Sequence, residues 1–313
     1  MIRIVLLALG LALLIFQQYI QAISVQLQFI FFITGIIVLG IPHGAADLLI
    51  ATQNAEGKKK SFSKIFFFVN YLGRIMLFGI VLWLFPLAGN LLFILFAAYH
   101  FGETDLFQFK TDTLFGKLFV ISYGLLILGV ILLNNLEEVQ PMLQLFSSAV
   151  KYEGFINWLN NYRYVILSCF TLFFFITSFF YFLYNNTNQQ IQGQFLVQFA
   201  LIIFILYNLP MVLGFTFYFI VWHSILSMNN IVRYLKKDGL LTTSATIKQI
   251  TLYSFLAMLG ISIFGFAGIM FISNNAIMVY VFLGLAVLTA PHMQVMHEMY
   301  KSIRSHQLIA KVP

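Results

Sequence analysis

Long apolar runs separated by short polar segments recur along the whole chain. A bilayer core of about 30 Å requires roughly 20 mostly apolar residues per helix. On this measure the sequence predicts ten membrane-spanning helices, at residues 4–22, 27–50, 65–86, 87–107, 114–134, 162–184, 195–211, 213–232, 249–272 and 277–299. The joins near residues 86, 210 and 275 are very short, so eight or nine spans with one re-entrant segment are the alternative.

The composition supports a protein that lies in lipid. Of the 313 residues, 61% are hydrophobic and only 9% are charged, which is more apolar surface than one soluble core can bury. No small-x-small cleavage site follows the apolar run behind Arg3, so we expect a span there rather than a signal peptide. The predicted fold is an all-α, multi-pass integral membrane bundle of about 8–10 transmembrane helices, forming a single domain over residues 1–313.

Positive charge predicts the orientation of the bundle. The net charge is +7, and most of the Lys and Arg residues lie in alternate connections between the predicted spans, apart from Lys151 in the long connection of about 135–161. Cytoplasmic loops carry an excess of Lys and Arg, so both termini are expected on the cytoplasmic side. Membrane orientation also accounts for the net positive charge, so we expect no nucleic-acid partner. The only cysteine, Cys169, lies in an apolar run, which excludes a disulfide framework and a thiolate metal site.

Four histidines, His43, His100, His223 and His292, lie in four different apolar segments. Ionisable side chains at bilayer depth are costly, so they usually face the interior of a bundle and mark a site. A lone histidine of this kind is more simply a core residue bonded to a carbonyl. Four on four helices favour a metal site, because imidazole binds Fe, Zn, Cu and Ni and one ligand per helix can converge on one ion.

Polar and aromatic neighbours extend this candidate site. Asp47 lies four residues after His43, on the same helical face, where its carboxylate could orient an imidazole bound to metal. Asp105 follows His100 near the end of a span, and either supports the site or meets water at the membrane surface. Candidates for the wall of a substrate tunnel are Tyr99, Phe101, Trp222 and Met293, although each is individually typical of plain packing.

A further histidine, His297, follows His292 by five residues. Five residues rotate a helix by about 140°, so the two rings cannot both face one ion from a regular helix. His292 lies deeper in its span, whereas Glu298 and Lys301 beside His297 are typical of a membrane interface. We therefore predict His292 as the ligand and keep His297 as the alternative.

The four histidine blocks carry a resemblance. They are Gly40–Asp47, Tyr99–Gly102 with Asp105 after it, Trp222–Ser224 and Ala290–Met293. From about residue 35 to residue 300, their order and spacing resemble the Brp/Blh family of membrane β-carotene 15,15'-dioxygenases. The resemblance implies an enzyme of the bacterial cell (inner) membrane. It would use Fe(2+) and O2 to cut the central double bond of β-carotene, or of a related carotenoid, inside membrane lipid. The product would be two molecules of retinal, which can be handed to a rhodopsin.

The sequence departs from this family at one position. Family members carry a second histidine one turn after the first in the Trp-His-Ser block, and here that residue is Ser227. A hydroxyl is a poor substitute for imidazole on iron, so His292 is the expected fourth ligand. Four neutral imidazoles on a roughly octahedral ion would leave two positions for O2 and the polyene.

Other classes of membrane protein fit less well. A b-type cytochrome usually carries spaced histidine pairs on the same helices, a desaturase needs HxxxH and HxxHH boxes, and a retinal pump needs a lysine in mid-span. The sequence has none of these. The runner-up is a multi-pass transporter or proton-relay protein in which Asp47 and Asp105 carry protons across broken helices. Bound iron with retinal formation would support the enzyme, and substrate flux without metal would support the transporter.

Overall fold

The computed structural model describes the chain except for residues 59, 141–152, 186, 237–241, 270–276 and 310–313. Most of the described residues are helical, and no strand occurs among them. The short join expected near residue 275, and the end of the predicted span 249–272, lie outside the described residues.

Each of the ten predicted spans falls on a helix or on a run of consecutive helices. In chain order these are α1 (Ile2–Ile15) with η1 (Phe16–Ile20); α2 (Val25–Gly35), η2 (Ile36–Gly40), α3 (Ile41–Ala45) and α4 (Asp47–Gly57); α5 (Lys64–Leu84); α6 (Pro86–Asp105); α7 (Leu114–Asn134); α9 (Glu153–Tyr184); α10 (Gln189–Asn208); α11 (Met211–Phe215), η4 (Thr216–His223) and α12 (Ser224–Leu235); α13 (Thr243–Ile269); and α14 (Ile277–Ile309). The η segments have π-helical hydrogen bonding.

Seven helical segments among the described residues are long and apolar enough to cross a membrane. They are Ile2–Ile20, Val25–Gly57, Lys64–Leu84, Leu114–Asn134, Glu153–Tyr184, Gln189–Asn208 and Met211–Leu235. The other three predicted spans lie on α6, α13 and α14. The predicted fold class, an all-α multi-pass membrane bundle, is therefore confirmed. The largest differences in boundary are at the end of α14, which continues ten residues past the expected 299, and at the start of α9, which begins nine residues before the expected 162, because the polar residues beside each apolar run are also helical.

The chain divides into two compact units. Unit 1 comprises Met1–Ile36 and Phe101–Leu226, and unit 2 comprises Ile37–His100 and Ser227–Pro313. The expectation of a single domain over residues 1–313 stays a prediction.

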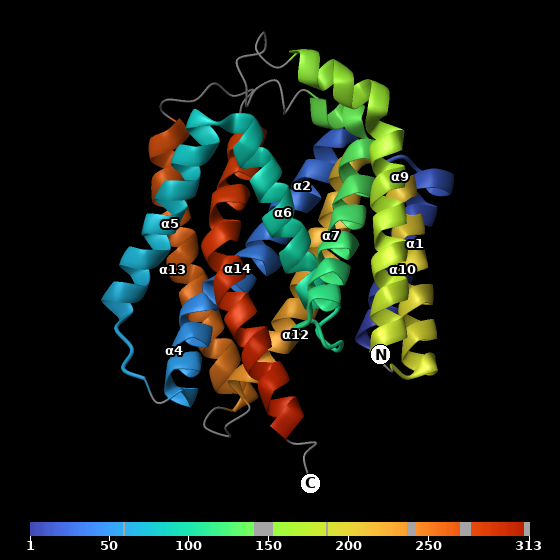
Figure 1. Cartoon of the computed structure of the whole chain (residues 1–313). Coiled ribbons are helices and arrows are strands. Elements are labelled where there is room, and N and C mark those ends of the chain that lie inside the picture. Colours follow the sequence, from blue (N-terminus) through green and yellow to red (C-terminus); the bar gives the residue numbers. More distant parts are fainter. Residues whose placement is uncertain (59, 141–152, 186, 237–241, 270–276, 310–313) are drawn as a thin grey trace. The chain divides into compact units, whose positions relative to one another are not determined.

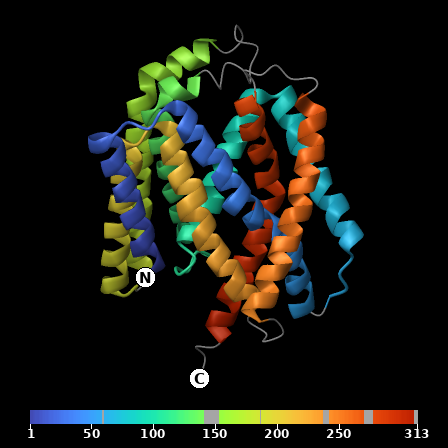
Figure 2. The same ribbon diagram turned by 180° about the vertical axis from the view of Figure 1, so that it is seen from behind.

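Unit 1 is built around aromatic packing. α7 packs along α9 (Figure 1), and α1 lies beside α10 (Figure 2). Phe174 of α9 and Phe199 of α10 have ring centroids 4.2 Å apart, and Phe119 of α7 and Tyr181 of α9 have ring centroids 4.8 Å apart. Close aromatic pairs add to the stability that burial of their surface provides.

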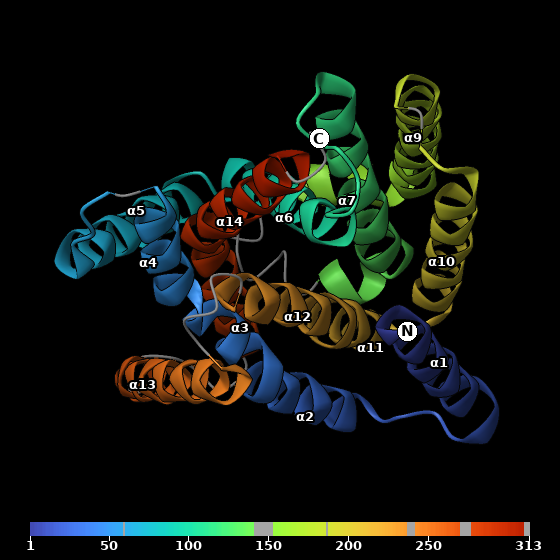
Figure 3. The ribbon, with the colours of Figure 1, turned by 90° about the horizontal axis from the view of Figure 1, so that it is seen from below.

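Unit 2 combines long helices with a short, irregular helical segment around residue 41. α3 packs against α13, while α14 packs against both α4 and α5 (Figure 3). Pro42 lies in the first turn of α3, directly after the π-helical segment η2. Proline cannot donate a backbone hydrogen bond, and π-helical turns are frequent at functional sites. The break in helical regularity thus falls on the block that carries His43.

One glycine sets the distance between α6 and α7 within unit 1. A Cβ atom added to Gly102 would overlap the backbone carbonyl oxygen of Val120. A carbonyl inside a helix cannot rotate away, so this close approach requires glycine.

We predict that Gly102→Ala lowers the free energy of unfolding by about 1–3 kcal/mol, the usual cost of overpacking a core. The measurement is the thermal midpoint of the helical circular dichroism signal in detergent. Gly193→Ala is the matched control, because Gly193 lies in α10 with nothing within 4 Å of an added Cβ. An equal midpoint for both variants would contradict the close-packing role of Gly102.

Candidate metal centre

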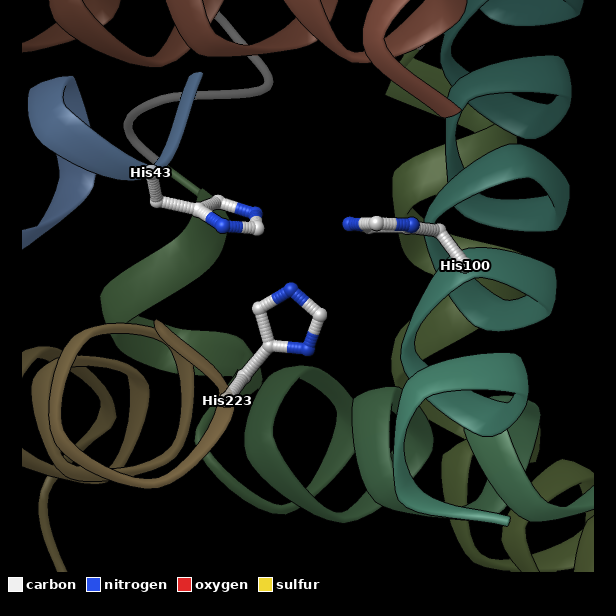
Figure 4. Close-up of side chains that lie close together, drawn as sticks. All are labelled: His43, His100 and His223. Atoms are coloured by element: carbon white, nitrogen blue, oxygen red, sulfur yellow. The ribbon is translucent and has the colours of Figure 1, made fainter. Parts of the chain in front are cut away.

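Three of the predicted ligands converge inside unit 2. His43 on α3, His100 on α6 and His292 on α14 are all buried. The ring centroids are 4.5 Å apart for His43 and His292, 4.9 Å for His100 and His292, and 6.1 Å for His43 and His100. Figure 4 shows the rings of His43 and His100 directed toward each other from their two helices, and a ring nitrogen of one lies within 4.8 Å of a ring nitrogen of the other.

A carboxylate orients one of these three rings. Oδ1 of Asp47 lies 2.8 Å from Nδ1 of His292, and the Tyr71 hydroxyl donates a hydrogen bond of 2.8 Å to Oδ2 of the same carboxylate. An Nδ1–H that donates to Asp47 leaves the lone pair of His292 on Nε2. This Nε2 lies 2.8 Å from Nε2 of His43, so it points into the cluster.

Asp47 therefore acts on a more distant residue than its spacing suggests. It shares a helical stretch with His43, four residues away, but its hydrogen bond goes to His292, which is 245 residues away in the sequence. Tyr71 was missed by sequence reasoning. A tyrosine within the apolar run of α5 was its only signal, and such residues are common in membrane helices.

The two histidines of α14 have different surroundings. His292 contacts the other two imidazoles, whereas Nδ1 of the half-buried His297 lies 3.2 Å from the Tyr99 hydroxyl. Tyr99 thus pairs with His297, and Met293 is half-buried beside His292. Pro291, inside α14, removes a backbone donor directly before His292, which membrane helices tolerate when neighbouring groups compensate.

The remaining predicted ligand, His223, belongs to unit 1. It is the last residue of η4 and is fully buried, with an exposed fraction of 0%. Its ring packs against Phe101, with centroids 4.7 Å apart, and lies nearly parallel to Phe219 at 6.1 Å. Phe101, a predicted tunnel residue, is therefore part of the packing that holds this imidazole.

Asp105 is the centre of a buried polar network in unit 1, and the alternative that it meets water at the membrane surface is wrong. Its Oδ2 accepts hydrogen bonds from the hydroxyls of Tyr123 and Tyr218, at 2.7 and 2.8 Å, and from Nε1 of Trp222 at 2.9 Å. The guanidinium of Arg3 donates to the backbone carbonyl of Asp105 at 2.5 Å and lies 6.0 Å from the Trp222 ring centroid.

This network reaches the segment that carries His223. Trp222 directly precedes His223, and Tyr218 lies five residues before it in η4. Trp222, which is also a predicted tunnel residue, donates its indole N–H to Asp105. The contributions of Tyr123, Tyr218 and Arg3 were not apparent from the sequence, because each comes from a different part of the chain.

Ser227 occupies the position where the resemblance led us to expect a further histidine. It lies on α12 and is completely buried, with an exposed fraction of 0%. Within the part of the chain that the structure describes, its hydroxyl has no hydrogen-bond partner. The position is thus buried and polar, but it offers no imidazole.

Comparison with known proteins assigns the family. The family model described as Beta-carotene 15,15'-dioxygenase matches residues 34–300, which include all four histidine blocks. Neither a curated protein nor a solved structure matches the chain. Because the matched segment covers most of the sequence, the chain belongs to the beta-carotene 15,15'-dioxygenase family of carotene-cleaving enzymes.

Proposed function

We propose that this protein is an iron(II)-dependent oxygenase of the membrane that cuts the central 15,15' double bond of β-carotene with O2 and forms two retinal molecules. The family match supports the reaction class. The observation that carries the proposal is the buried cluster of His43, His100 and His292 in unit 2.

The donor set fits ferrous iron. Imidazole suits Fe(II), and the three rings of this cluster come from three helices and are buried. Cys169 is exposed and offers no competing buried thiolate. We assign His223 of unit 1 as a further ligand, supported by its complete burial and by its place in a matched block. Bound iron would activate O2 for insertion across the alkene.

The residues around the ligands would orient them and exclude water. Asp47, held by Tyr71, would keep His292 in the tautomer that presents Nε2 to the metal. Asp105 would hold η4 through Trp222 and Tyr218, and so position His223. Ser227 cannot replace an imidazole, which leaves His292 to complete the set.

The substrate and the surroundings follow from this assignment. An apolar polyene would reach the site from membrane lipid, along walls that include Tyr99, Phe101, Trp222 and Met293. We place the protein in the bacterial inner membrane, as the family resemblance implies, and both termini on the cytoplasmic side, on the basis of the basic loops between its spans. Retinal formed there would be available to a rhodopsin in the same membrane.

Expression in β-carotene-producing cells tests the function directly. We expect the orange colour to bleach, retinal to be extractable, and the purified protein to hold about one iron, the content that a single His centre implies. His43→Ala, His100→Ala, His223→Ala and His292→Ala should each remove iron and activity.

His297→Ala is the control for this set and should retain iron. Full iron in His292→Ala with loss of iron in His297→Ala would reverse the choice between the two histidines. Substrate flux through a metal-free protein, with no retinal, would favour the transporter instead.

We predict that Asp47→Asn weakens iron binding by about 10–100-fold, the usual cost of losing a hydrogen-bond partner of a metal-bound imidazole. Tyr71→Phe should have a smaller effect in the same direction. Iron affinity is measured by competition with a chelator. Glu56→Gln, an exposed change on the same helix α4, is the control, and wild-type affinity in Asp47→Asn would refute the orienting role.

Tyr218→Phe tests the network around Asp105. Loss of one hydrogen bond to a charged group should lower the free energy of unfolding by about 1.5–3 kcal/mol. Because Tyr218 holds η4, iron affinity should fall as well. The control is Tyr207→Phe, which alters an exposed ring. A destabilised variant with unchanged iron affinity would limit Asp105 to a structural role.

A further inference from the structure

A pocket of about 330 Å³ lies within unit 2 between α4, α5 and α14. Each of these helices contributes one face. On α14 the lining residues run from Pro291 to Glu298, and on α5 the lining includes Phe67, Tyr71 and Arg74, at spacings of three and four residues. Seven residues of α14 correspond to about 10 Å, so the pocket extends along the helices.

The inner end of this pocket adjoins the histidine cluster. Pro291 directly precedes His292, and the Tyr71 hydroxyl in the pocket wall donates to Asp47, which in turn bonds His292. A ligand in the pocket would therefore lie two side chains from a proposed iron ligand.

The pocket wall contains a cation deep within an apolar span. Arg74 is half-buried, and ten residues of α5, about 15 Å of helix, separate it from Lys64 at the start of the span. Ionisable residues in such positions are costly and usually serve a site. Among the residues that the structure describes, the Arg74 guanidinium has no ion pair and no hydrogen bond, and the nearby lining carboxylate, Glu298, binds Lys58 at 2.7 Å.

The rest of the wall is amphipathic. The side-chain amides of Asn70 and Gln294 line the pocket together with Arg74, and aromatic rings, including Phe66 and Phe67, form the apolar part. Such a wall suits a molecule with a long apolar body and one oxygen-bearing end. Ligand sites are commonly apolar, with a few polar groups that orient the ligand.

We propose that this pocket binds the retinoid product, with the terminal oxygen toward Arg74 and the polyene against the aromatic wall. The assignment rests on the proposed function. β-Carotene is a hydrocarbon and offers the guanidinium no acceptor, whereas cleavage creates an aldehyde oxygen at the end of each half. Arg74 would thus favour product over substrate and draw retinal away from the histidine cluster.

Binding of tritiated ligands to protein stripped of iron and held in lipid nanodiscs tests this proposal. Retinal and retinoic acid, whose carboxylate cannot form an imine with lysine, should both bind, and β-carotene should not compete for this site. Arg74→Gln should weaken retinoic acid binding about tenfold or more, as expected for a lost hydrogen bond to a charged group. Arg233→Gln, which alters an exposed arginine of unit 2, should leave binding unchanged.

A second variant covers the case in which Arg74→Gln does not fold. Val295→Trp fills the pocket and keeps the charge, and should block retinoid binding. Unchanged retinoid affinity in either folded variant would overturn the proposal. Palmitate bound as tightly as retinoic acid, with the same dependence on Arg74, would overturn it in favour of a site for membrane fatty acids.

The two proposals fail in different ways. The binding assay requires neither iron nor turnover, so loss of the retinoid site with intact carotene cleavage would overturn the pocket alone. Retinoid binding in a protein that neither holds iron nor cleaves β-carotene would overturn the proposed function alone.

Discussion

The hydrogen bond between Asp47 and His292 is the interaction on which the candidate centre depends. It joins α4 to α14, and the Tyr71 hydroxyl ties α5 to the same carboxylate. In an apolar interior, a carboxylate and an imidazole are each costly unless they satisfy one another. The bond therefore explains how a polar cluster is tolerated at this depth, and it also sets which nitrogen of His292 faces the other rings.

Unit 1 has a similar hydrogen-bonded arrangement around a different carboxylate. Asp105 accepts three side-chain hydrogen bonds on one oxygen, two from η4 and one from α7. Arg3 adds a positive charge beside it from the N-terminal helix. In both units a buried carboxylate holds the helix that carries a proposed ligand, so preorganisation of the ligands and stability of the fold depend on the same few polar contacts.

The separation of apolar walls from polar side chains agrees with the chemistry of carotene cleavage. The substrate has no polar group, so aromatic and aliphatic walls suffice to bind it. The product carries an oxygen atom, and a polar group in the wall can form a hydrogen bond only with that atom. An arginine in a pocket beside the histidine cluster, rather than inside it, is consistent with a molecule that becomes polar only after the reaction.

The sequence alone determined the helical spans and the histidines of interest. Bilayer thickness imposes a local rule on the length of an apolar run, and the cost of an ionisable group in lipid makes each histidine conspicuous without knowledge of its neighbours. The sequence did not reveal Tyr71, Tyr218 or Arg3 as partners of the two carboxylates, nor the preference of Asp47 for His292 over the nearby His43. Tertiary structure alone decided these, because the rotation of each helix and its contacts with residues up to 245 positions away set the partner of a buried polar group.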